Sequence, residues 1–402
     1  MTHRKPNSAT TCGWLTALLL SALLAGCGGG GDGGGSGTLG VSLTDSPACG
    51  FDEVNVTVSK VRVHQSGGAP EDAGGWSEIT LSPARKINLL DLTNGVLESL
   101  GETALPAGHY TQLRLMLVAN NAASPANNSV VLSSGTPAGE IALITPSAVQ
   151  SGIKLIHEFD VAAGQRVDLV LDFDACKSVV ALGDGGYLLK PVIKVIPTEL
   201  NGINGFVDAS LLAGNVTVSA QLNGAVVRST VPVASTGSFF LARLAPGNYD
   251  VVITADDHAT AVIAAVPVAS STSVVMVSTN TTPIALPVST SQSISGTATL
   301  NPVSTTDEVI FVAAKQTFDG GPTVTVKSHA AGLLSGEYML TMPIGNPVLG
   351  QYTAGALPIT LVPQDGVAGK YTVEASATDY QTQSVIADIS AGDAIEIFTL
   401  TP

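Results

Sequence analysis

Three aspartates in the middle of the sequence are spaced so that they could bind a metal ion together. Asp168, Asp172 and Asp174 lie in a segment of alternating apolar and polar residues, so in a strand they would share one face. Asp172 and Asp174 would lie ~7 Å apart along that strand. Carboxylate oxygens are the ligands that calcium prefers, and Asp45 or Asp52 could complete the set. These residues are therefore candidate calcium ligands.

The same acidic row has a structural interpretation that involves no metal. A row of carboxylates on one strand commonly faces solvent, and basic side chains relieve the repulsion between them. Three basic residues could each pair with one of the acids: Lys177, Lys190 and Arg114. Paired carboxylates also serve glycoside hydrolysis, which needs two facing groups ~5–9 Å apart. Here the acids share one strand beside a lysine, and no groove aromatics accompany them, so hydrolysis is the weaker interpretation.

Other signs of catalysis are absent from the sequence. It contains no G-x-S-x-G, H-E-x-x-H or P-loop motif. Its six histidines are scattered; His109 follows a Pro-Ala-Gly turn, and His157 lies in a predicted strand. A histidine without nearby partners is commonly a surface or hydrogen-bonded residue. We therefore expect no enzyme, and no cofactor other than the candidate calcium.

The N-terminus has the form of a secretory signal peptide. Arg4 and Lys5 precede an apolar run from Trp14 to Ala25 that ends in small residues. This run is too short to span a bilayer, which needs ~20 apolar residues. We therefore expect the chain to be exported.

The end of this signal carries a further chemical feature. The sequence Leu24-Ala25-Gly26-Cys27 resembles the lipobox of bacterial lipoproteins, in which the cysteine thiol takes up a diacylglycerol before cleavage. The resemblance implies cleavage before Cys27 and a lipid anchor on it; the alternative is an ordinary signal peptide with a chance cysteine. By the same resemblance, Gly28 in place of Asp after the cysteine favours the outer membrane. Gly28 to Gly37 is nearly all glycine and would act as a flexible tether.

Export would place the remaining cysteines in an oxidising compartment, where disulfides form. Cys12 lies in the signal, so only Cys49 and Cys176 remain besides the lipid site. Cys49 follows the first predicted strand and Cys176 ends a later one, so both could lie on one rim of a sandwich. We predict a disulfide between them; two separate buried thiols are the alternative.

Composition and charge narrow the class of protein. The 402 residues include only 12% charged and 4% aromatic residues, and Val, Thr, Ala, Ser and Gly are frequent. Val and Thr favour strands, and Gly and Pro favour turns, so an all-β protein is expected. The net charge of -15 becomes -17 without Arg4 and Lys5. An acidic chain without a basic patch repels phosphate, which argues against nucleic acid as a partner.

Alternating strand patterns recur along the whole chain after the tether. One runs from Val54 to Val63, with a change of phase near Ser59 and Lys60 that predicts a β-bulge. Only Asn94 to Gly101 could hold a short helix. The pattern predicts tandem antiparallel β-sandwich domains. The expected segments are 1–26 (signal peptide), 27–37 (lipidated cysteine and linker), 38–200, 201–287 and 288–402.

The first of these domains contains an ordered set of motifs. Leu43-Thr44-Asp45-Ser46-Pro47, Leu105-Pro106-Ala107-Gly108-His109-Tyr110 and the segment Asp172 to Val180 are followed by Tyr187-Leu188-Leu189-Lys190-Pro191. Together they resemble the DUF4382 domain of bacterial and archaeal exported proteins and lipoproteins. That family has no established activity, so the resemblance implies a type of domain and no reaction.

The two later domains share a second pattern. Thr236 to Leu241 and Gly247 to Val251 read as an apolar hairpin, and Ser335 to Leu340 and Gly369 to Val373 repeat it about 100 residues later. The pattern resembles the carboxypeptidase regulatory-like domain, a seven-stranded sandwich of the transthyretin or carbohydrate-binding-like kind. That family implies a spacer, cohesion or glycan-binding role without catalytic residues. The resemblance is weaker in the third region, where Pro343 to Val367 is an insertion.

These features predict a non-catalytic, lipid-anchored protein of the cell envelope that acts in adhesion or ligand display. Its partners would be the membrane, through the lipid, and a glycan or an envelope protein. A glycan-binding lipoprotein is the first alternative, and its aromatic platform would be drawn from Trp76, Tyr352 and Tyr380. An enzyme of unrecognised type is the second alternative.

Overall fold

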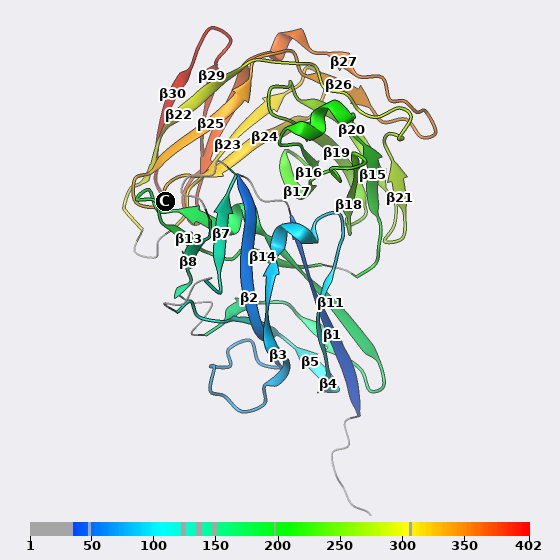
Figure 1. Ribbon diagram of the computed structural model, residues 1–402, viewed down its shortest axis with the longest axis vertical. Coiled ribbons are helices and arrows are strands. Elements are labelled where there is room, and N and C mark those ends of the chain that lie inside the picture. Colours follow the sequence, from blue (N-terminus) through cyan, green and yellow to red (C-terminus); the bar gives the residue numbers. More distant parts are fainter. Residues whose placement is uncertain are drawn as a thin grey trace, which may run out of the picture. The chain divides into compact units, whose positions relative to one another are not determined.

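The computed structural model consists of three groups of β-strands that follow one another along the chain (Figure 1). It describes residues 35–46, 50–121, 126–133, 139–146, 151–196, 198–304 and 308–402. We call β1–β14 the first module, β15–β21 the second module and β22–β30 the third module. Within these residues, none of the helices has the length and apolar character that crossing a membrane requires.

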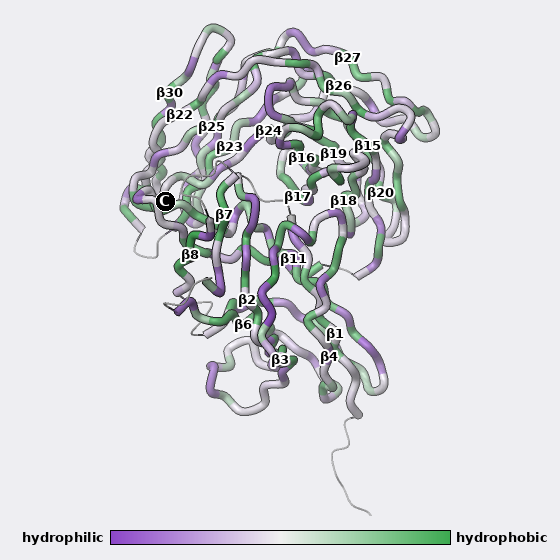
Figure 2. The backbone as a smooth tube through the Cα atoms, in the orientation of Figure 1, coloured by the Kyte–Doolittle hydropathy of each residue, from purple (hydrophilic) through white to green (hydrophobic). Residues whose placement is uncertain are grey.

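The first module is built around β1 (Ser36–Ser46), an inner strand of a four-stranded sheet in the order β14-β11-β1-β4. β1 runs parallel to β11 (Arg166–Asp174) on one side and antiparallel to β4 (Glu98–Pro106) on the other. Leu39, Val41 and Leu43 point into the core, because alternate residues of a strand face the same side. Hydropathy alternates in this way along many strands (Figure 2).

A larger sheet covers the other side of this core. Its order is β12-β13-β8-β7-β2-β6-β9, with β3 also paired to β2 (Phe51–His64). The register of β2 shifts between Val58 and Lys60, which confirms the predicted β-bulge. Both sheets contribute to one continuous hydrophobic core. The other elements of the module are β3 (Ser77–Asn88), η1 (Leu89–Leu92), β5 (Gly108–Tyr110), β6 (Gln112–Leu117), β7 (Ser129–Leu132), β8 (Ile141–Ile144), β9 (Ile153–Leu155), β10 (Phe159–Val161), α2 (Ala175–Ser178), β12 (Val179–Ala181), β13 (Tyr187–Leu189) and β14 (Ile193–Ile196).

The short helix expected from Asn94 to Gly101 is wrong. A 3-10 turn occupies Leu89–Leu92 instead, and β4 already begins at Glu98. Asn94 and Gly95 have φ values of 56° and 79°, which lie outside the right-handed helical region. These two residues therefore form a tight turn between η1 and β4.

The second and third modules have the same strand order. Each contains a three-stranded sheet, β18-β15-β21 or β25-β22-β30, whose inner strand is parallel to one neighbour and antiparallel to the other. Each also contains the array β17-β16-β19-β20 or β24-β23-β28-β29, with a register shift after Ala220 or after Ala314. The repeat in the sequence is therefore a repeat of topology. The elements are β15 (Gly202–Phe206), η2 (Ala209–Ala213), β16 (Thr217–Leu222), β17 (Ala225–Thr230), β18 (Ser238–Ala242), β19 (Gly247–Thr254), β20 (Ala261–Val268), β21 (Val274–Met276), β22 (Ser291–Leu300), β23 (Phe311–Thr317), β24 (Thr323–Ala330), β25 (Glu337–Pro343), β26 (Val348–Gln351), β27 (Val362–Pro363), η3 (Asp365–Val367), β28 (Lys370–Ser376), β29 (Gln383–Asp388) and β30 (Ala394–Leu400).

The predicted all-β sandwich class is confirmed, but the sheets are not purely antiparallel. Among the described strands, five pairs run parallel: β1 with β11, β8 with β13, β15 with β21, β20 with β26 and β22 with β30. The partners in each pair are separated by long stretches of chain. Such long connections allow a parallel arrangement, whereas a two-residue hairpin requires an antiparallel one.

The modules pack against one another within the unit Gly35–Pro402. The insertion that interrupts the third region contributes β26 and β27 to the sheet of the second module. Val252 and Val262 of the second module share a small core with Phe318 and Val324 of the third. The first and third modules meet where Val180 packs near Val309 and Ala330.

Two buried tyrosines anchor the turns that precede them. The hydroxyl of Tyr110 donates to the carbonyl oxygen of Pro106 (3.0 Å), and that of Tyr249 donates to the carbonyl oxygen of Ala245 (2.7 Å). Each bond spans four residues and closes a Pro- and Gly-containing turn, as in the tyrosine corner of other β-sandwiches. Burial raises the pKa of both phenols. The first and second modules therefore use the same device at equivalent turns.

We expect Tyr249→Phe to lower the free energy of unfolding by about 1 kcal/mol, because it removes one intramolecular hydrogen bond and keeps the buried ring. Urea denaturation of residues 27–402 with Cys27→Ser measures this loss. Tyr380→Phe is the control, because its hydroxyl binds the Pro302 carbonyl oxygen (2.8 Å) at an exposed position. Equal losses of unfolding free energy in the two variants would show that the Tyr249 hydrogen bond stabilises the fold no more than an exposed hydrogen bond does.

Candidate functional site

The three predicted calcium ligands all lie on β11, and each has a basic partner of its own. Asp168 binds the Arg166 guanidinium at the exposed end of the strand (Nε to Oδ2, 2.8 Å). Asp174 accepts from the backbone N–H of Lys177 (3.1 Å) and pairs with its ammonium group (2.7 Å). Asp172 is buried and pairs with Arg228 of the second module.

This pairing favours the structural interpretation of the acidic row. Among the described residues, no group of three or more His, Cys, Asp or Glu side chains is placed to hold a metal ion. Lys177 pairs with one of the acids, as that interpretation expected. Arg114 does not; its guanidinium donates to the carbonyl oxygens of Ala69 and Ser151 (both 2.8 Å). Asp45 comes near the end of β11, where it accepts from the N–H of Ala175 (3.1 Å).

Asp172 and Arg228 form a buried ion pair between the first and second modules. The side chain of Asp172 is only 5% exposed to solvent, and that of Arg228 is 8% exposed. Burial raises the pKa of Asp172, and Asp174 adds to this effect, whereas Arg228 and Lys194 lower it. Removing two charges from water costs several kcal/mol, so the pair forms only where its geometry is favourable. The pair therefore acts as a specific contact between the two modules.

The turn at Asn94 and Gly95 forms the second part of this junction. The Asn94 side-chain oxygen accepts from the N–H of Phe240 on β18 and from the Thr230 hydroxyl (both 3.0 Å). Its amide nitrogen donates to the Val231 carbonyl oxygen (2.7 Å). The Arg243 guanidinium donates to the Gly95 carbonyl oxygen (3.0 Å). One turn of the first module thus satisfies backbone groups at the edge of the second.

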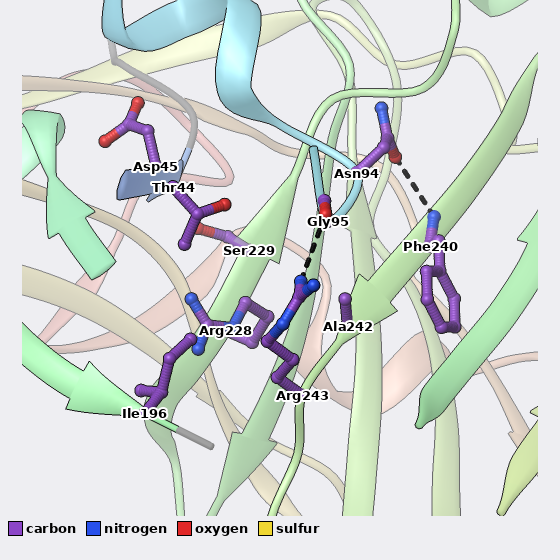
Figure 3. Close-up of a pocket in the computed structure, with 10 residues that line it drawn as sticks. All are labelled: Thr44, Asp45, Asn94, Gly95, Ile196, Arg228, Ser229, Phe240, Ala242 and Arg243. Carbon is purple, nitrogen blue, oxygen red and sulfur yellow. Dashed lines mark hydrogen bonds between the residues drawn. The ribbon is translucent and has the colours of Figure 1, made fainter. Parts of the chain in front are cut away.

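A small cavity lies between these groups (Figure 3). Arg228, Arg243, Thr44 and Asp45 line it with Asn94 and its neighbours, and its volume is about 10 Å³. The buried Nε groups of Arg228 and Arg243 have no hydrogen-bond partner within the described residues. A cavity needs roughly 10–15 Å³ to hold one water molecule. The junction therefore has room for one bridging water and no room for a larger ligand.

A larger hollow lies on the outer face of the sheet β18-β15-β21. Its volume is about 310 Å³, and Phe206, Phe240, Val233 and Val274 line it around Asn204. No charged residue is among its lining residues. The volume is at the lower end of that of ligand pockets. The hollow could hold an apolar group. Its polar side chains are a hydroxyl and amides, and none of its lining residues is an acid or a base.

The aromatic residues proposed for a glycan platform are engaged elsewhere. The guanidinium groups of Arg62 and Arg114 lie over the Trp76 ring, at 4.6 and 4.9 Å from its centre. Tyr352 packs against the core of the second module and Tyr380 against that of the third. These three rings therefore do not form one open stacking surface.

The remaining predicted site residues are histidines and cysteines. His109 is exposed and lies 2.8 Å from Asp160, while burial lowers the pKa of His157. Cys176 is disulfide-bonded. Its predicted partner, Cys49, and the predicted lipid site, Cys27, lie outside the described residues, so both assignments stay predictions.

The sequence analysis missed the residues of the junction. Asn94-Gly95 is a typical turn dipeptide, and that signal was available. Arg228 is a single charge in an apolar strand, which indicates a buried partner. Nothing in the sequence pairs it with Asp172, which lies 56 residues earlier.

We expect Arg228→Met to lower the free energy of unfolding by about 3–5 kcal/mol near neutral pH, because Asp172 then stays buried without its partner. The loss should depend on pH. Without Arg228 the folded-state pKa of Asp172 rises further above its ordinary value of 3.8. As the pH rises, the unfolded chain loses the Asp172 proton at a lower pH than the folded chain does. The free energy of unfolding therefore falls from about pH 4 upward.

Chemical denaturation between pH 4 and 8 measures this dependence. The double variant Asp172→Leu/Arg228→Met should recover most of the loss, because it leaves no unpaired charge. Arg166→Met is the matched control, on β11 with Asp172; its exposed ion pair with Asp168 should contribute little. A pH-independent loss for Arg228→Met would contradict the assignment of the cost to Asp172.

Comparison with known proteins supports the resemblance of the first module. Residues 36–191 match the family described as "Domain of unknown function (DUF4382)". No curated protein matches the sequence. The family match covers three strands of the four-stranded sheet, β11, β1 and β4, and ends just before β14.

Several solved structures are also similar to parts or most of the chain. A streptococcal ancillary pilin is 11% identical over 91% of this chain and 98% of its own, with a TM-score of 0.19. BcpA, the major pilin subunit of Bacillus cereus, is 11% identical over 91% of this chain and 99% of its own, with a TM-score of 0.16. A cohesin–X-dockerin complex from Acetivibrio cellulolyticus is 22% identical over 22% of this chain, with a TM-score of 0.19.

This chain spans 58% of the length of the cohesin complex chain and 51% of the Bacillus anthracis TIE protein, which is also similar. TM-scores this low carry no argument about function. The comparisons therefore show a similarity for one part of the chain: residues 36–191 match the DUF4382 family.

Proposed function

We propose that this protein is a lipid-anchored component of the bacterial cell envelope that binds or displays a ligand and catalyses no reaction. The observation that carries the proposal is the use of its charged groups. Asp172 and Arg228, which are both buried, join the first module to the second. The hollow around Asn204, which is of ligand size, has no charged residue among its lining residues.

The anchor is supported by the sequence and by the position of β1. Leu24 to Cys27 resembles a lipobox, and the glycine-rich segment after it leads directly into β1 at Ser36. Gly28 after the cysteine favours the outer membrane. We further propose domains at 38–200, 201–287 and 288–402, with the second and third of the carboxypeptidase regulatory-like kind. Their shared topology supports this assignment.

Adhesion or ligand display is the role that fits this arrangement best. The glycine-rich segment precedes Ser36, the first residue of β1, and the second module lies near Ser46, its last residue. An extended strand of this length separates its two ends by ~33 Å. The first module would therefore hold the later modules away from the membrane. A glycan as the ligand is less well supported, because the Trp76 ring is covered.

We expect Cys27→Ser in the full chain to leave an uncleaved precursor without lipid, because serine lacks the thiol that takes up the diacylglycerol. Mass spectrometry of the N-terminus, in a bacterium that processes lipoproteins, tests this. Cys12→Ser is the matched control and should be processed normally. A mature N-terminus that begins elsewhere, or carries no lipid in the unsubstituted protein, would refute the anchor.

Adhesion is tested with cells that carry the unsubstituted protein or the Cys27→Ser variant. Immobilised glycans and envelope proteins serve as probes on one panel. Retention of the cells on at least one probe, lost in the Cys27→Ser variant, is the expected result. Turnover of a panel glycan by the purified chain would contradict the non-catalytic role.

A further inference from the structure

The second and third modules differ at one equivalent edge of their larger sheets. In the second module β26 continues the sheet beyond β20, in parallel, and the N–H of Tyr352 donates to the Ala264 carbonyl oxygen (3.0 Å). The equivalent strand of the third module is β29, which ends the order β24-β23-β28-β29. Within the described residues, no strand pairs with the outer edge of β29. An edge that is completed in one module is therefore open in the other.

Alternate residues of β29 turn their backbone groups toward this open edge. In an antiparallel pair, the residues that bond to the neighbouring strand alternate with residues that face away from it. The N–H of Ile389, directly after β29, donates to the carbonyl oxygen of Gly369, directly before β28 (2.8 Å). By this alternation the N–H and C=O groups of three residues point outward: Ser384, Ile386 and Asp388.

The open edge of β29 lacks the features that usually protect a free strand. Natural edges are blocked by lysine, by proline or by a β-bulge. β29 contains neither lysine nor proline, and its six residues pair with β28 without a register shift. By contrast β27, at the end of the second module's sheet, contains Pro363. Ile386 is 76% exposed. The edge is therefore suited to accept a further strand.

We propose that β29 pairs with β29 of a second copy of this chain, antiparallel and across a two-fold axis at Ile386. The inference goes beyond the proposed function and depends on neither the anchor nor the ligand. In this register Ile386 lies opposite Ile386 of the second copy, and Ser384 lies opposite Asp388. The sheets β24-β23-β28-β29 of the two copies then form one continuous sheet.

The chemistry of the edge favours a second copy as the occupant. A two-fold interface uses the same surface on both chains, so its residues must complement one another. The exposed Ile386 side chain is covered by its own copy, the Ser384 hydroxyl can donate to the Asp388 carboxylate, and the two Asp388 carboxylates stay apart. Stable complexes bury roughly 1,200–2,000 Å². One strand pair is small by comparison, so we expect a weak dimer.

Sedimentation velocity of residues 27–402 with Cys27→Ser tests the proposal from micromolar to nearly millimolar protein. The average mass should rise from that of one chain toward that of two. Ile386→Lys should raise the dissociation constant by roughly tenfold or more, because two ammonium groups then meet across the axis. The substituted side chain is exposed, so the core stays unchanged.

Thr372→Lys is the matched control. Thr372 lies opposite Ile386 on β28, so this variant adds the same charge to the same face, one strand away from the edge. It should dimerise like the unsubstituted protein. Near-ultraviolet circular dichroism checks that both variants have folded. The mass of one chain at every concentration, or equal weakening in the two variants, would overturn the proposal.

Crosslinking tests the register of the pair. Hydrogen-bonded partners in an antiparallel pair have Cα atoms ~5.5 Å apart, which a disulfide can span. Ile386→Cys should therefore form a covalent dimer on mild oxidation. Thr372→Cys should not, because the two copies of β28 would lie three strand spacings, or ~14 Å, apart. Crosslinking of Thr372→Cys, or none of Ile386→Cys, would overturn this pairing.

These measurements separate the proposal from the proposed function. The chain that sediments carries no lipid and meets no ligand, so failure of lipidation or of adhesion does not affect its mass. A chain that stays monomeric in solution, although the full protein is lipidated and retains cells, would overturn self-association alone.

Discussion

The buried ion pair of Asp172 and Arg228 is the constraint on which the arrangement of the first two modules depends. Two charges removed from water must meet in good geometry or the contact does not form. The pair holds β11 next to β17. The side-chain oxygen of Asn94 then accepts a hydrogen bond from the N–H of Phe240 on β18. The second module is in turn joined to the third through β26. This junction thus sets the approach of the second module to the first, whereas the third module also contacts the first directly, where Val180 packs near Val309 and Ala330.

Ion pairing also determines what the acids of β11 can do chemically. The acids of β11 are all paired, with Arg166, Arg228 and Lys177. Acids that are held by bases in this way are poor candidates for metal ligands or for general acid–base catalysis, because their charge is already compensated. The hollow around Asn204 carries no charge. The charged groups of β11 therefore have structural roles.

The sequence predicted the features that depend on local pattern. The all-β class and the bulge after Val58 follow from the period of apolar residues within single strands. The repeat of the later modules follows from a hairpin motif that recurs about 100 residues later. The helix expected after Asn94 failed because tertiary contacts hold that residue at positive φ. The partner of Arg228 and the parallel pairing of β1 with β11 could not be predicted. Both join segments far apart in the sequence, and strand alternation does not encode which strands pair.

Hydrogen exchange of the mature chain tests the central claim, that the first and second modules form one unit through this junction. The N–H of Phe240 is the most informative amide, because its hydrogen bond runs to Asn94 of the other module. The account predicts that the Phe240 amide exchanges as slowly as the amides of the inner strands of the second module. The Arg243 amide is an internal reference, because it donates to the Asn201 carbonyl oxygen of its own module (2.8 Å). Exchange of the Phe240 amide as fast as that of an exposed strand edge, with the inner strands still protected, would contradict it.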